Sequence, residues 1–214
     1  MSDIFREIDE ELRRDNLAKL WARYGNYVIG LAVVIVLATA AVVGWQKYEA
    51  SRRHALSIRY AAALELAQKD ETAKAADAFA ALAREASGGQ AVLARLQEAM
   101  LRAKSGNTAA AIAAYKSLSQ DGSIDPAYRD LATLLAALHE LGTVEPKTVI
   151  AELEPLTRNG NPWRPSALEV TALAQLRAGD RAAALQIYKT LADDLTAPQA
   201  LRQRATEMAA ALAG

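Results

Sequence analysis

Residues 106–118 read GNTAAAIAAYKSL, and related stretches occur at two other places in the chain. The three stretches are TAKAADAFAAL (Thr72–Leu82), TAAAIAAYKSL (Thr108–Leu118) and RAAALQIYKTL (Arg181–Leu191), aligned on Phe79, Tyr115 and Tyr188. The aligned aromatic residues are 36 and 73 positions apart, and the second gap is almost two periods. Gly106-Asn107 and Gly179-Asp180 precede the last two stretches. A glycine, a polar residue and an alanine-rich helix with one aromatic residue predict a recurring helix–turn–helix unit.

A period in the mid-thirties is similar to that of tetratricopeptide repeats, which stack helical hairpins into a solenoid. Alanine at the predicted helix contacts, as at Ala111 and Ala184, permits close approach, and the aromatic residue fills the next gap. One hairpin cannot bury its own apolar face, so neighbouring hairpins must stack. The sequence therefore predicts an all-α fold, with a tetratricopeptide-like α-hairpin solenoid over residues 47–214.

The skipped period indicates a degenerate unit at Tyr128–Thr157. Its turn is expected at Leu141-Gly142 and its second helix at Thr148–Thr157. Glu152 stands where an aromatic residue is expected, and Pro146 and Pro155 bracket the helix. All six prolines lie after residue 125, so residues 46–120 are expected to be the most regular helical portion.

The stretch NGNPWRPS (Asn159–Ser166) then predicts a firm boundary before the last hairpin, because it holds two prolines and a glycine. Trp163 in this loop is either a plug over the core or an exposed contact, and we favour the plug. Pro198 is expected to open a final helix, Ala200–Leu212, that caps the stack.

A different kind of segment, NYVIGLAVVIVLATAAVVGW (Asn26–Trp45), precedes the repeats, and no charged residue occurs between Tyr24 and Gln46. A helix over Tyr27–Trp45 is about 28 Å long at 1.5 Å per residue, which matches the hydrocarbon layer of a bilayer. Aromatic residues suited to the two membrane interfaces flank it: Tyr24, Tyr27, Trp45 and Tyr48. We expect a transmembrane helix at residues 26–46.

A cleaved signal peptide is the competing interpretation, because Ala38-Thr39-Ala40 fits the small-x-small cleavage pattern. The long segment before the apolar stretch contains six acidic residues, whereas the start of a signal peptide is usually short and basic. An uncleaved anchor is therefore favoured. Four basic residues flank each side of the predicted span, so the positive-inside rule leaves its orientation open. They are Arg13, Arg14, Lys19 and Arg23 before it, and Lys47, Arg52, Arg53 and Arg59 after it.

Residues 1–25 predict an amphipathic helical arm, capped by Ser2 or Asp3. Its apolar positions are Phe5, Ile8, Leu12, Leu17, Leu20, Trp21 and Tyr24. This pattern suits a helix at a membrane surface or against a partner, and it equally suits a solvated helix that leads into the span.

The chain carries 25 acidic and 25 basic residues, and this balance argues against a nucleic-acid-binding protein. It has no cysteine, which excludes disulfides, thiol catalysis and cysteine metal sites. The two histidines, His54 and His139, belong to no recognisable catalytic constellation. We therefore expect a binding protein rather than an enzyme, with no catalytic, cofactor-binding or metal-binding residues and no small-molecule substrate.

A stack of this type presents the first helix of each hairpin on its inner surface. Placing the repeat frame from Gly106 and Gly179 gives the inner positions Ser57, Tyr60, Leu64, Leu93, Leu96, Met100, Ser166, Glu169 and Leu173. The candidate binding groove consists of the apolar members Tyr60, Leu64, Leu93, Leu96, Met100 and Leu173. The alternative is that the frame has slipped and these side chains belong to the core, as Arg102 at a usually aromatic position indicates.

The combination of a short charged arm, one span ending in Gly44-Trp45, the basic pair Arg52 and Arg53, and degenerate hairpins resembles a known family. The chain resembles the YfgM-like family, whose members are ancillary subunits of the bacterial Sec translocon. The arm EIDEELRRDNLAKLWARYG also resembles the N-terminal segment of the tetratricopeptide-bearing members of this family. The resemblance implies an inner-membrane protein with a cytoplasmic N-terminus and a periplasmic repeat domain. It also implies partners: the Sec translocon, a membrane-anchored periplasmic chaperone and emerging protein clients.

The leading hypothesis is thus a single-span protein that assists periplasmic chaperones near the translocon. The alternative is a membrane-tethered scaffold or assembly factor for an envelope or respiratory complex. A groove for unfolded clients predicts contacts with many proteins, whereas an assembly scaffold predicts one stoichiometric partner.

Overall fold

The computed structural model describes the backbone of residues 2–214 and the side chains of residues 20–27 and 29–214. Over these residues the chain is all-α, as predicted. The helices are α1 (Ser2–Gln68), α2 (Thr72–Glu85), α3 (Gly88–Lys104), α4 (Thr108–Ser119), α5 (Pro126–Glu140), α6 (Pro146–Leu153), the 3₁₀ helix η1 (Glu154–Thr157), α7 (Arg164–Arg177), α8 (Arg181–Asp193) and α9 (Gln199–Ala213). The chain divides into two compact units, Met1–Ala55 and Leu56–Gly214.

Among the described residues, one helical segment is long and apolar enough to cross a membrane. A membrane anchor and a signal sequence both have this length and composition. None of the residues in the most apolar 18-residue window of the segment is buried within the protein. Large apolar side chains such as Ile29, Val36 and Leu37 are more than half exposed. The structure does not describe the side chains of part of the predicted arm. These are the apolar residues Phe5, Ile8, Leu12 and Leu17 and the predicted caps Ser2 and Asp3.

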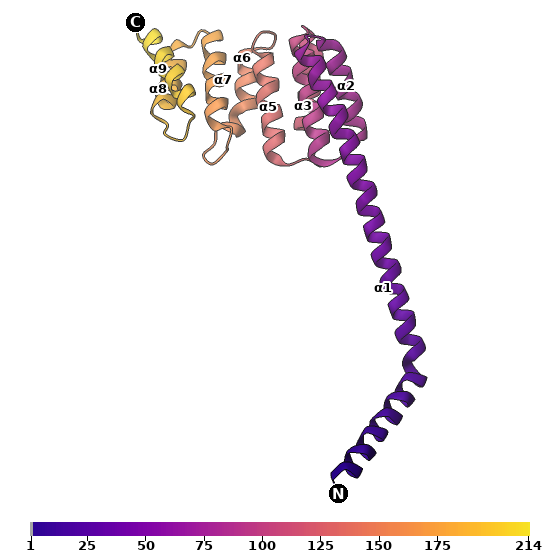
Figure 1. Cartoon of the computed structure of the whole chain (residues 1–214). Helices are drawn as coiled ribbons and strands as arrows, with labels where there is room; N and C mark the ends of the chain where they lie inside the picture. Colours follow the sequence, from indigo (N-terminus) through magenta and orange to yellow (C-terminus); the bar gives the residue numbers. More distant parts are fainter. Residues whose placement is uncertain (1) are drawn as a thin grey trace. The chain divides into compact units, whose positions relative to one another are not determined.

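The second unit is a row of helices in chain order, each packed against its sequence neighbours (Figure 1). The end of α1 packs against α2: Tyr60 meets Phe79 at a centroid distance of 5.0 Å, Arg59 pairs with Glu85, and Leu56 and Ala63 share a core cluster with Phe79. From α2 onward, contacts follow the order α2–α3, α3–α4, α4–α5, and so on to α8–α9. Because contacts remain between neighbours, the unit has the nearest-neighbour organisation of a helical-repeat protein.

The three alanine-rich helices start where the repeat pattern places them. Gly106 and Gly179 both adopt φ +84°, a left-handed conformation that favours glycine. The next residue caps the following helix: Asn107 Oδ1 accepts from the N–H of Ala110, and Asp180 Oδ1 accepts from the N–H of Ala183. The predicted glycine–polar turns are therefore confirmed.

The turn before α2 has the same geometry without a glycine. Asp70 stands 36 positions before Gly106 and adopts φ +58°, the single positive φ among the described non-glycine residues. Aspartate tolerates this conformation better than most residues do, at a steric cost that glycine avoids.

These turns give a paired prediction on stability. Gly106→Ala is expected to lower the free energy of unfolding by about 1 kcal/mol, because a Cβ is disfavoured at this φ. Asp70→Gly is expected to raise it by about 0.5 kcal/mol, although the exposed Asp70–Lys104 ion pair of 2.9 Å is lost. Urea unfolding of the full chain in detergent measures both. Gly89→Ala, at a helical glycine with open space around it, is the control and is expected not to destabilise.

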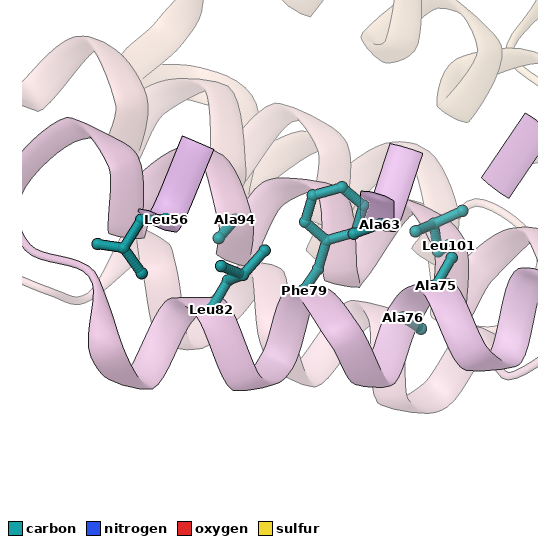
Figure 2. Packing of buried hydrophobic residues seen from close by; sticks show 8 residues of the cluster. All are labelled: Leu56, Ala63, Ala75, Ala76, Phe79, Leu82, Ala94 and Leu101. Carbon is teal, nitrogen blue, oxygen red and sulfur yellow. The ribbon is translucent and has the colours of Figure 1, made fainter. Parts of the chain in front are cut away.

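The aromatic residues of the pattern lie in the core. Phe79, Tyr115 and Tyr188 are each no more than 2% exposed, and Ala111 and Ala184 are fully buried beside them. Figure 2 shows Phe79 at the centre of the first cluster, close to Ala63, with Leu82 on one side and Leu101 on the other. Alanines thus bring the helices together and the aromatic rings fill the space between them, as the sequence predicts.

The degenerate hairpin is present as α5 and α6, and residues 141–145 between them contain the predicted Leu141-Gly142 turn. Helix α6 begins at Pro146, two residues before the predicted start, because proline fits the first turn of a helix, where its missing N–H costs nothing. Pro155 does not end the helical segment outright, since η1 continues the chain to Thr157.

Trp163 is a plug, as favoured from the sequence. Its side chain is half-buried against the cluster that contains Val149 and Leu153, and its Nε1 donates to the carbonyl of Ala127 at 2.8 Å. The loop is shorter than predicted, because Arg164 already begins α7 and Pro165 lies in its first turn. Helix α9 follows Pro198 and packs against α8 as the last helix, as expected.

A second repeated ion pair joins the first helix of a hairpin to the end of its second helix or to the residues just after it. Arg59 pairs with Glu85, and Arg95, 36 positions later, pairs with Asp121 at 2.7 Å. The corresponding Asp194 pairs with Arg164 at 2.8 Å. Asp121 Oδ1 also accepts from the N–H and hydroxyl of Ser123, and Asp194 Oδ1 does the same with Thr196.

This ion pair predicts a loss of stability in acid. The Ser123 hydroxyl and Arg95 lower the pKa of Asp121 from its ordinary 3.8 to about 2. Because the folded pKa lies below the unfolded one, the stabilisation is present above about pH 4 and is lost as the pH falls towards about 2. Fluorescence-monitored urea unfolding at several pH values tests this. Asp121→Asn is expected to reduce the fall in the free energy of unfolding between about pH 4 and pH 2. The control Asp193→Asn, at an exposed residue, is expected to show the same fall as the wild type.

Candidate protein-binding surface

An apolar pocket of about 200 Å³ lies at the start of the second unit, between the end of α1, the end of α2 and the start of α3. Its lining residues are Leu56, Ser57, Tyr60, Leu82, Ala86, Gln90, Leu93 and Ala94. Pockets for drug-sized ligands usually measure about 300–1,000 Å³, so this one suits a single large apolar side chain better than a cofactor.

The wall of the pocket is fixed by packing beneath it. Tyr60 rests edge-on against the buried ring of Phe79, with an angle of 75° between the ring planes. Leu56 and Leu82 belong to the same buried cluster as Phe79. The core of the first hairpin therefore holds Tyr60 in place.

An ion pair is formed by residues that neighbour two lining residues, Tyr60 and Ala86, in the sequence. Arg59, next to Tyr60 in the chain, binds Glu85 through both terminal nitrogens, with Nη2 donating to Oε1 at 3.1 Å. The two charges offset each other, so the pocket offers chiefly shape and apolar surface to a partner.

The structure brings together two of the six residues predicted to line a groove, since Tyr60 and Leu93 both line the pocket. Leu93 and Met100 lie two turns apart on α3 and are 44% and 48% exposed. We call these two side chains the α3 face. These two side chains offer a partner an apolar strip along one side of the helix, interrupted by Gln97 and by the half-buried Leu96.

The other predicted groove residues are half-buried. Tyr60 and Leu64 pack against the cluster around Phe79, Leu96 packs against the clusters around Tyr115 and Leu118, and Leu173 lies on α7 outside the pocket. The prediction of a groove formed by all six residues stays a prediction.

Sequence reasoning missed part of the pocket and one whole cavity. Leu82 and Ala94 were visible only as members of helical patterns, and nothing in the sequence indicated that they meet Leu56. A cavity of about 750 Å³ lies between the loop before α7, the start of α7, the end of α8 and the residues that follow α8. It is lined by Asn159, Gly160, Asn161, Pro162, Arg164, Pro165, Thr190, Asp193, Asp194 and Thr196.

A buried carboxylate lies elsewhere, where α4, α5 and α6 meet. Lys116 Nζ contacts Glu140 Oε1 at 2.6 Å and Glu152 Oε1 at 2.9 Å. The carboxylate of Glu140 is almost completely buried, with 4% of the side chain exposed. Glu152, which interrupts the aromatic pattern, therefore makes a contact between hairpins instead of filling a gap.

The histidines have different surroundings. His139 stacks on the buried ring of Tyr115, with a centroid distance of 5.8 Å and an interplanar angle of 7°, whereas His54 is exposed. Among the residues with described side chains, no group of three or more His, Asp or Glu residues is arranged to hold a metal ion.

A comparison with protein families matches residues 18–209 to a model described as a tetratricopeptide repeat-like domain. The match extends from the arm, across the apolar segment, into the last helix α9. No curated protein and no solved structure matches the chain.

Proposed function

Because this chain belongs to the tetratricopeptide repeat-like domain family, we propose that it is a membrane-anchored protein-binding module that serves secreted or envelope proteins. Domains of this family are typically non-catalytic binding scaffolds. In the proposed arrangement, residues 26–46 span the bacterial inner membrane, the arm 1–25 is cytoplasmic, and residues 47–214 are periplasmic. The aromatic residues Tyr24, Tyr27, Trp45 and Tyr48 are the proposed interface anchors.

The observation that carries the membrane part is the exposure of an uncharged helical segment. Burying apolar surface releases about 25 cal/mol per Å², so the exposed Ile29–Val43 side chains favour an apolar surrounding that the protein itself does not provide. A hydrocarbon layer supplies that surrounding, and the helix satisfies its own backbone polar groups there.

The observation that carries the binding part is the apolar pocket with the α3 face beside it. Emerging or unfolded proteins expose large apolar side chains, and a pocket for one such side chain beside an apolar strip suits them. The proposed partners are the Sec translocon, a membrane-anchored periplasmic chaperone and their protein clients, as the resemblance implies.

Crosslinking in intact cells tests this function. A photoreactive residue at Leu93 or Met100 is expected to capture translocon components, a periplasmic chaperone and many different clients. The same residue at Glu207, on the exposed side of α9, is the control and is expected to capture few of them. One dominant partner outside the secretion pathway would instead establish the assembly-scaffold alternative.

The binding surface predicts a second result. Leu93→Glu together with Met100→Glu is expected to reduce client crosslinks from Tyr60 about tenfold or more, because each charge meets an apolar client surface. Both side chains are exposed, so the fold is expected to remain intact. The control is Leu138→Glu, at a residue of similar exposure (42%) on α5. Equal losses in both variants would contradict the proposed surface.

The orientation can be measured directly, because the chain has no native cysteine. A single cysteine at Glu207 is expected to react with a membrane-impermeant maleimide from the periplasmic side, and one at Glu10 is expected to be protected. The reverse pattern would overturn the proposed topology.

A further inference from the structure

One ionic cluster, with a buried carboxylate at its centre, joins the second hairpin (α3 and α4) to the third hairpin (α5 and α6). It contains Lys116 from α4, Glu140 from the end of α5 and Glu152 from α6. Both carboxylates contact the same Nζ atom, so their Oε1 atoms are held close to each other. We call these three residues the junction cluster.

The junction cluster contains two carboxyl groups and one ammonium group. The second oxygen of Glu140, Oε2, is buried and accepts no hydrogen bond from the described residues. A buried carboxylate oxygen without a donor is costly, and so is a second negative charge beside it. A proton on Glu140 removes the charge of the buried carboxylate and leaves one carboxylate for one ammonium group, so the cluster has no net charge.

We propose that the junction cluster is a proton-linked latch, closed when Glu140 is protonated and weakened when that proton leaves. The latch connects α4 to both helices of the next hairpin, so its weakening opens the boundary between the second and third hairpins. The proposal rests on contacts within residues 116–152 and does not depend on the identity of any partner.

Among the residues with described side chains, no further ion pair to Glu140 or Glu152 neutralises the second carboxylate. On α5, the neighbouring His139 stacks on Tyr115. From α7, Arg177 donates to the carbonyls of Val144 and Gly142 rather than to a carboxylate of the cluster. On α3, Arg102 pairs with Glu98 at 2.8 Å.

The protonation behaviour follows from burial. Burial raises the pKa of Glu140 above its ordinary value, the hydrogen bond from Lys116 lowers it, and the neighbouring Glu152 carboxyl raises it again, with a net upward shift. The hydrogen bond to Glu140 raises the pKa of Lys116, which stays protonated. A cavity of about 210 Å³ lined in part by Lys116 and Glu152 gives water and protons access to the cluster.

The sign of the pH effect is opposite to that of Asp121. A group whose folded pKa is raised stabilises the fold fully below its unfolded pKa, and this stabilisation is lost as the pH rises through the folded pKa. The latch therefore weakens as the pH rises above about 4.5. In the interval between the two pKa values, the equilibrium constant for opening increases by up to about tenfold per pH unit.

Hydrogen exchange of the full chain in detergent, followed by mass spectrometry from pH 4.5 to pH 8, tests the latch. After correction for the intrinsic exchange rate, peptides from residues 126–157 are expected to lose protection as the pH rises. Peptides from residues 181–213 are expected to change less. Glu140→Gln and Glu152→Gln are each expected to flatten the profile of residues 126–157, because either variant leaves one carboxylate for one lysine.

The two variants Glu140→Gln and Glu152→Gln and the control Glu154→Gln make the test independent of whether one variant fails to fold. Glu152 is 31% exposed, so Glu152→Gln is expected to fold even if Glu140→Gln does not. Glu154→Gln, which removes an exposed carboxylate paired with Arg158 at 3.1 Å, is expected to leave the profile unchanged. A wild-type profile without pH dependence, or the same dependence in Glu152→Gln as in the wild type, would overturn the proposal.

Discussion

Phe79→Ala is expected to lower the free energy of unfolding by about 3–5 kcal/mol, the typical cost of removing a large aromatic side chain from a core. Phe79 is fully buried and lies at the centre of the cluster formed by α1, α2 and α3 (Figure 2). The surrounding residues include Ala63, Ala75 and Ala76, whose short side chains cannot extend into the vacated space. The cavity therefore stays largely open, which places the cost near the upper part of the range.

The same substitution is expected to affect the apolar pocket, because Tyr60 loses the ring on which it rests. Urea unfolding measures the stability, and crosslinking from Leu93 measures binding. Phe79→Leu, which keeps most of the volume, is the matched variant and is expected to cost roughly 1 kcal/mol. Ile58→Ala, at a side chain 58% exposed on α1, is expected to change little. A Phe79→Ala cost below that of Phe79→Leu would contradict the packing described.

Leu37→Arg is expected to disfavour membrane insertion by roughly 3 kcal/mol, because a charged residue near the centre of a span is costly and leucine is favourable there. Leu37 is near the middle of the uncharged segment and is 63% exposed, so no protein contact is lost by the change. The expected result is a large shift of the chain from the membrane fraction to the soluble or degraded fraction. Extraction of membranes with alkaline carbonate, followed by immunoblotting, measures this shift.

The matched control for this experiment is Leu195→Arg. Leu195 is 86% exposed between α8 and α9, so the same chemical change there is expected to leave membrane association unchanged. Leu37→Ala, which keeps the segment uncharged, is also expected to remain in the membrane. Full carbonate resistance of Leu37→Arg would argue that residues 26–46 do not span the bilayer.

The sequence predicted those turns that glycine marks. Gly106 and Gly179 indicated left-handed turns, and both adopt positive φ. The equivalent turn at Asp70 could not be recognised, because aspartate occurs far more often in ordinary turn and cap positions than at positive φ. Alignment by the 36-residue spacing is the signal that identifies it.

The third hairpin shows why a pattern alone is insufficient. The sequence showed that Glu152 occupies a position where the other repeats have an aromatic residue. Its ionic contacts depend on Lys116 and Glu140 in neighbouring helices. No local rule connects these positions, since a contact over 36 residues depends on how the hairpins stack. The burial of Glu140 is likewise a tertiary effect, because a helix-ending glutamate is usually solvated.

The predicted groove shows a further limit. Met100 is exposed on α3, whereas Leu64, 36 positions earlier on α1, packs partly against the core. A repeat frame assigns each residue to an inner or outer position, but small rotations of the helices decide how deeply each side chain is buried. Half-buried residues are therefore the ones that periodicity assigns least well.

The contacts between neighbouring hairpins have a consequence for the rate and order of folding. The side-chain hydrogen bonds that connect different helices span 22–36 residues, as in Arg95–Ser117 and Lys116–Glu152. Chains dominated by such short-range contacts fold rapidly, since little loop entropy is lost before a contact forms. Each hairpin can thus complete its packing once the next hairpin has left a ribosome or a membrane pore. A chain of this type acquires its structure vectorially, from its N-terminal hairpin towards α9.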